Sequence, residues 1–137
     1  MIGSFALELI FSLIAIVAIT GGYVYLAREE APQPSGLLGH GLGIVGFLMM
    51  LSTETLYSLR KRLPRFTTWQ MSTWLQIHIF TGIVGSYLVV LHSAWKFNGL
   101  AGVVTFLTVV IVVSGFVGRY IYTAVPRTLD GAELSVR

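Results

Sequence analysis

The stretch that decides the fold is STWLQIHIFTGIVGSYLVVLHSAW, residues 72–95, an apolar run long enough to cross a bilayer. It carries His78 and His92, which are 14 residues apart, about four helical turns and roughly 21 Å along a helix axis. At about 100° per residue, 14 steps return to within about 40° of the start, so both imidazoles leave one helix face. Between them lie Gly82 and Gly85, which let a flat ring approach. The pattern favours a helix serving one or two haem sites, and packed core histidines are the plainer alternative.

Composition places the whole chain in a membrane. Of its 137 residues, 55% are hydrophobic and 11% charged, and four stretches approach or exceed the ~20 apolar residues that span a bilayer. We predict an all-α integral membrane protein, a single-domain four-helix transmembrane bundle over 1–137 with up-down-up-down order and spans of about 5–27, 36–57, 73–94 and 100–123. The lack of cysteine excludes disulfides, thiolate metal sites and iron–sulfur clusters. The net charge of +3 gives no indication of nucleic-acid binding.

The basic residues predict the orientation in the membrane. They gather in the second link and the C-terminal tail, at Arg60, Lys61, Arg62, Arg65, Arg127 and Arg137. On the other side Arg28 is offset by Glu29 and Glu30, and Lys96 stands alone. By the positive-inside rule we expect both termini on the cytoplasmic side, and the membrane we expect is a bacterial inner membrane.

The predicted second helix, GLLGHGLGIVGFLMMLSTETLY, is rich in glycine around His40. Gly43 and Gly46 would leave room for a ring beside His40, and close helix packing is the common alternative explanation for such glycines. Glu54 follows His40 by 14 residues, and an ionisable group that deep in a span suggests a functional site.

An antiparallel hairpin of the second and third helices, centred near Phe66, places His40 level with His92 and Glu54 level with His78. The first pair would form a bis-histidine clamp near the external surface. The second would form a carboxylate–imidazole pair nearer the cytoplasm. We expect all four side chains to face the same interface.

Three further charged residues lie near the ends of the predicted spans. Lys96, about one turn past His92, is a candidate partner for a haem propionate or else a solvated side chain. Arg119 and Glu8 both lie near the cytoplasmic surface, where we expect them to snorkel toward the lipid headgroups. A propionate or Glu54 is the alternative partner for Arg119.

Taken together, these residues resemble a small membrane cytochrome b of the four-helix or ferric-reductase-like type. The resemblance spans about residues 36–127 and rests on four motifs: GLLGHGLG with His40, YSLRKR at 57–62, WLQIHIFTGIVGSYLVVLHS with His78 and His92, and SGFVGRYIY at 114–122. The 14-residue histidine spacing also matches the two-haem helices of quinone-linked cytochromes b. Such two-haem proteins need four histidines, whereas this chain has three and carries Glu54 in the fourth place.

The resemblance implies an electron-carrying subunit of a larger membrane redox complex that transforms no substrate on its own. It implies one haem b on His40 and His92, and offers a second haem at His78 as a further candidate. The expected partners are membrane lipid, other subunits of the complex and, as a further candidate, quinone. Two other classes compete: a small proton-coupled transporter with Glu8 or Glu54 as its proton carrier, and a pigment-binding or structural membrane subunit.

Three interpretations of His78 and Glu54 stay open at this point. His78 could ligate a second haem whose other ligand comes from a neighbouring subunit. The pair could instead form a proton-handling quinone site, because imidazole and carboxylate both carry protons. The third interpretation is a structural hydrogen bond.

Overall fold

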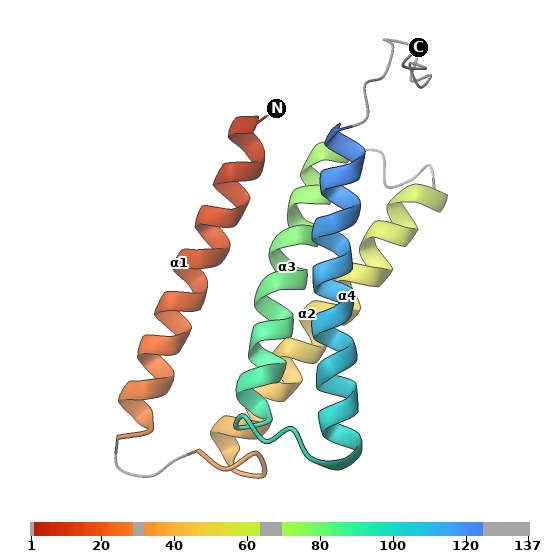
Figure 1. Ribbon diagram of the computed structural model, residues 1–137. Coiled ribbons are helices and arrows are strands. Elements are labelled where there is room, and N and C mark those ends of the chain that lie inside the picture. The colour runs from red at the N-terminus through yellow and green to blue at the C-terminus, as the bar shows by residue number, and fades with distance from the viewer. Residues whose placement is uncertain (1, 29–31, 64–69, 125–137) are drawn as a thin grey trace, which may run out of the picture.

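The computed structural model describes residues 2–28, 32–63 and 70–124, and the regular structure in these ranges is four α-helices. They are α1 (Ile2–Leu26), α2 (Leu37–Arg62), α3 (Met71–His92) and α4 (Gly99–Ala124). Successive helices run in opposite directions, so the start of α1 and the end of α4 lie at the same end of the molecule (Figure 1). The predicted all-helical fold with up-down-up-down order is therefore confirmed.

Each helix is long and apolar enough to cross a membrane, which supports the membrane character expected from the composition. The helix boundaries differ most from the predicted spans at α2, which continues to Arg62. Its last turn holds Arg60, Lys61 and Arg62. Cations there interact favourably with the negative end of the helix dipole, so the helix continues beyond its apolar part.

The central element of the fold is α3. It packs against α1, α2 and α4, whereas within the described residues those three helices do not pack against one another. Its contact with α2 is the most extensive. The buried apolar core accordingly lies on α3, at Val84, Leu88 and Leu91.

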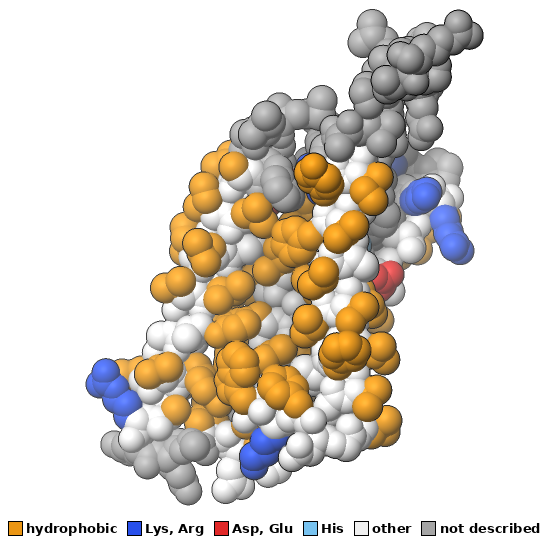
Figure 2. All heavy atoms as spheres, viewed as in Figure 1, with side chains coloured by type: hydrophobic (Ala, Val, Ile, Leu, Met, Phe, Trp, Pro, Cys, Tyr) orange, Lys and Arg blue, Asp and Glu red, His pale blue; other side chains and the backbone are white. Residues whose placement is uncertain are grey.

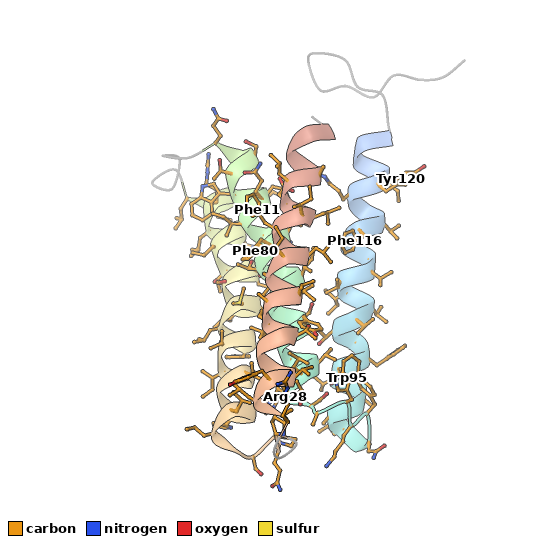
Figure 3. The ribbon with its side chains drawn as sticks, turned by 90° about the vertical axis from the view of Figure 1, so that its left-hand side faces the viewer. Phe11, Arg28, Phe80, Trp95, Phe116 and Tyr120 are labelled. Carbon is orange, nitrogen blue, oxygen red and sulfur yellow. The ribbon has the colours of Figure 1, made fainter. Side chains whose placement is uncertain are left out.

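The outer faces of α1 and α4 are covered by large apolar side chains, which form most of the surface seen in Figure 2. Phe11 on α1 and Phe106 on α4 are both more than half exposed. Figure 3 shows Tyr120 pointing away from the other helices. Such faces are suited to contact with lipid, which solvates apolar side chains at no cost.

A pair of hydroxyl groups joins α1 to α3 toward the end of the molecule where α1 ends. The Oγ1 atom of Thr20 lies 2.6 Å from the carbonyl oxygen of Ile16 and 2.6 Å from the Tyr87 hydroxyl oxygen. Because Thr20 donates its proton to the Ile16 carbonyl, the Tyr87 hydroxyl is the donor between the two helices. This hydrogen bond fixes α1 and α3 in a parallel arrangement with Thr20 level with Tyr87.

The chain reverses direction directly after His92. Ala94 and Trp95 both adopt the left-handed conformation, with φ values of 48° and 60°. Non-glycine residues pay a steric penalty there, so this turn must be held by its surroundings. The Trp95 ring meets the Phe97 ring edge-on at 6.3 Å between centroids.

Candidate functional site

The candidate site is the contact between α2 and α3, which is built from two strings of residues at seven-residue intervals. On α3 the string is His78, Gly85 and His92, and on α2 it is Thr53, Gly46 and Gly39. Each residue of one string meets the residue at its own depth on the other, because the helices are antiparallel. The hairpin depth expected from the sequence is therefore correct to within one residue.

The middle of the contact is a crossing of two glycine backbones. A Cβ atom on Gly46 would lie 2.9 Å from the carbonyl oxygen of Gly85, and one on Gly85 would lie 3.0 Å from the Cβ of Met49. The first distance is shorter than a real Cβ atom tolerates, and the second is so short that Met49 would have to shift, so both positions favour glycine. These two glycines serve helix packing, the alternative explanation raised by the sequence.

At one end of the contact, where α2 begins and α3 ends, the ring of His92 lies on the backbone of α2. Its Nδ1 atom is 2.7 Å from the carbonyl oxygen of Gly39, and a Cβ on Gly43 would lie 2.8 Å from the ring. Since a carbonyl oxygen can only accept, Nδ1 carries the proton and donates it. The lone pair of the neutral ring is then on Nε2, the nitrogen available to a metal ion.

At the other end of the contact, His78 repeats this arrangement with Thr53. The Nδ1 atom of His78 is 3.1 Å from the carbonyl oxygen of Thr53. The Thr53 hydroxyl oxygen lies 2.7 Å from that of Thr81, and each hydroxyl also reaches a carbonyl one turn earlier in its own helix. The space beside this cluster, lined in part by Leu56 and Trp74, has no room for a water molecule. Around His78 and Thr53 the α2–α3 contact is therefore polar and leaves no space for water.

His40 and Glu54 do not occupy the contact, contrary to the expectation that they face α3. Both side chains are exposed, and their neighbours Gly39 and Thr53 lie against α3 instead. One residue corresponds to a rotation of about 100°. The physical reason is the close approach of the two backbones, which requires Gly46 to face α3. With α2 in this rotation about its axis, Gly39 and Thr53, seven residues away on either side, also face α3. His40 is thus next to the His92 contact without being in it, and Glu54 does not pair with His78 in this arrangement.

The remaining predicted site residues lie outside this contact or at its margin. A Cβ on Gly82 would meet the Thr53 methyl group at an ordinary 3.7 Å, so this position does not require glycine. Lys96 is exposed just beyond the turn that follows His92, and Arg119 is half-buried near the end of α4. Within the described residues, no three histidine or acidic side chains come together as a metal-binding group. Arg65 and the tail arginines lie outside the described residues.

The structure also reveals a polar site that the sequence analysis assigned differently. Glu8 and Ser12 on α1 are only 7% and 2% exposed, so Glu8 does not snorkel outward. The Oε2 atom of Glu8 and the Oγ atom of Ser12 are buried without a hydrogen-bond partner among the described residues. The sequence signal was present in the four-residue spacing of Glu8 and Ser12, which places two polar side chains on one face of an otherwise apolar helix.

Comparison with known proteins adds no relative, since no family model, no curated protein and no solved structure matches the chain.

Proposed function

We propose that the chain is a haem b-binding subunit of a membrane redox complex, with His92 as one axial ligand of the iron. The observation that carries this proposal is the hydrogen bond from Nδ1 of His92 to the carbonyl oxygen of Gly39. Metal-binding histidines typically donate their second ring N–H to a carbonyl or carboxylate, which fixes the tautomer and raises the basicity of the other nitrogen. The half-buried ring of His92 has this arrangement within a membrane-spanning helix.

The donor groups at the external end of the hairpin fit a haem, but the space between α2 and α3 does not. The backbones meet at Gly46 and Gly85, and Gly43 accommodates the imidazole of His92 itself, so a porphyrin has no room along this contact. His40 is exposed one residue beyond Gly39. A haem bound by both histidines would therefore lie on the exposed outer end of the hairpin.

When bound, haem b supplies a one-electron couple between Fe(III) and Fe(II). The protein's contribution is to hold the His92 ring through Gly39 and to surround the site with apolar side chains that disfavour added charge. The links between the helices are short, so the electron donor and acceptor would belong to other subunits, with quinone as a further candidate. We propose further that the protein lies in a bacterial inner membrane with both chain termini on the cytoplasmic side, as the positive-inside rule predicts.

Reduced-minus-oxidised absorption spectra of the purified protein test this function. We expect the bands of a low-spin haem b, lost in His92→Ala and in His40→Ala while circular dichroism shows the helices intact. His78→Ala serves as the comparison: it removes the same kind of side chain from the other end of α3, beside a space with no room for a water molecule, so we expect the bands of the haem at His92 to remain. A colourless wild-type protein would refute the proposal, and a spectrum that survives His40→Ala would leave His92 as the only assigned ligand.

A further inference from the structure

A second polar site lies between α1 and α3, away from the face of α3 that contacts α2. Glu8 and Ser12 are separated by one helical turn, and side chains at this spacing lie next to each other on the helix surface. Both side chains are more than nine-tenths buried. Neither Oε2 of Glu8 nor Oγ of Ser12 has a hydrogen-bond partner in the described part of the chain.

The depth of Glu8 along the bundle follows from the parallel arrangement of α1 and α3. Thr20 contacts Tyr87, so Glu8, which is 12 residues before Thr20, lies level with Leu75 of α3. The titratable side chain of α3 near this level is His78, and its Nδ1 is engaged with Thr53 of α2. Arg119 lies on α4, which packs against α3 and, within the described residues, not against α1. Glu8 therefore receives no charged partner from the helix that covers it.

We propose that Glu8 and Ser12 form a proton-binding site, in which the carboxyl group of Glu8 takes up a proton and shares a hydrogen bond with Ser12. A buried carboxylate without a counter-charge is costly, and a proton removes the charge. The same proton gives the carboxyl group a donor, so that both buried oxygens can be satisfied by one hydrogen bond. The proton comes from hydronium at the membrane end where α1 begins, leaving water and a neutral carboxylic acid.

Acidic residues within a membrane commonly belong to ion or proton pathways. Further polar side chains of the α1–α3 interface lie farther along the same helix pair. Thr20 lies about two turns beyond Ser12 and about 80° from it around the axis of α1, and its hydroxyl accepts from Tyr87 of α3. The α1–α3 interface thus carries acid and hydroxyl groups at both ends within an otherwise apolar helix pair. This site is independent of whether α2 and α3 bind haem.

Infrared difference spectra recorded between about pH 4 and about pH 9, where carboxyl groups normally titrate, test the site directly. We expect a pH-dependent carboxylic-acid C=O band at the high frequency typical of an acid shielded from water, and its complete loss in Glu8→Gln. Glu54→Gln is the matched control, because Glu54 is exposed and its removal should leave the band in place. Ser12→Ala should shift the band to higher frequency, because the hydrogen bond to the acid is lost.

The absence of any band sensitive to Glu8→Gln across this range would overturn the proposal, as would such a band at the frequency of a hydrated acid. Glu8→Asp keeps a carboxyl group on the same face and should retain a shifted acid band, which guards against a Glu8→Gln protein that fails to fold. Replacing choline with Na⁺ at constant ionic strength should have no effect on the band. Loss of the acid band on addition of Na⁺ would mean that Na⁺ displaces the proton, and that the site binds a metal cation in place of a proton.

Discussion

His92 donates a hydrogen bond of 2.7 Å to the backbone carbonyl of Gly39, and this contact fixes both the depth and the rotation of the α2–α3 hairpin at the end where α2 begins. The same relationship recurs 14 residues away between His78 and Thr53 at 3.1 Å. Two imidazoles of α3 thus donate hydrogen bonds to two backbone carbonyls of α2. The histidine spacing that first suggested a haem helix therefore also has a purely structural consequence.

Gly43 should be essential for the position of the His92 ring. A Cβ at this position would lie 2.8 Å from Cγ and Nδ1 of the imidazole, so Gly43→Ala should push the ring away from Gly39. We expect the ¹⁵N resonances of the His92 ring to lose the pattern of an Nδ1-protonated, hydrogen-bonded imidazole. Gly41→Ala is the matched control, because a Cβ there meets nothing within 4 Å, and unchanged resonances in Gly43→Ala would contradict the packing.

The glycine crossing should dominate the stability of the hairpin. Gly46→Ala puts a methyl group 2.9 Å from the carbonyl oxygen of Gly85 and should destabilise the protein by ~1–3 kcal/mol, as overpacking does. Gly115→Ala on α4 meets nothing within 4 Å and should be neutral or stabilising by up to ~1 kcal/mol through helix propensity. Reversible unfolding in mixed micelles measures both changes. Equal effects of the two substitutions would show that the crossing has no special role.

The hydroxyl pair should provide a measurable part of the attachment of α1. Tyr87→Phe removes the donor to Thr20, while Thr20 keeps its bond to the Ile16 carbonyl, so the loss should be ~0.6 kcal/mol and at most ~2 kcal/mol. Thr20→Val and the double variant complete a double-mutant cycle in the same unfolding assay. If the effects of Tyr87→Phe and Thr20→Val simply add, the two hydroxyl groups do not interact.

Topology can be tested cleanly because the natural chain contains no cysteine. Ser35→Cys and Lys96→Cys, at exposed positions on the external side, should react with a membrane-impermeant maleimide on intact cells. Arg62→Cys, at the exposed end of α2, should react only after the membrane is opened. The reverse labelling pattern would invert the orientation inferred from the positive-inside rule.

The sequence predicted the four helices, their alternating directions and the depth at which α2 and α3 meet, because apolar length and hairpin geometry determine these features. It did not predict the rotation of α2. A 14-residue spacing is shared by the pair His40 and Glu54 and by the pair Gly39 and Thr53, so periodicity alone cannot choose between them. The choice depends on how closely the backbones approach at Gly46, which is a property of the packed pair.

The sequence indicated the polar spacing of Glu8 and Ser12 but not the burial of these side chains, for a related reason. A carboxyl group near the end of a membrane-spanning helix is normally placed at the membrane surface, where its side chain can reach water. In the structure Ser12 and Glu8 lie on the face of α1 that meets α3. Which face of an almost uniformly apolar helix is covered depends on its partner.

The central position of α3 has a consequence for biogenesis. A ribosome delivers the helices in chain order, so α1 and α2 enter the membrane before α3 has been made. Within the described residues neither has a native contact with the other. A nascent chain arrested after α2 would therefore leave Glu8 and Ser12 facing lipid or the insertion machinery, and the arrival of α3 is the event that converts separate inserted helices into one protein.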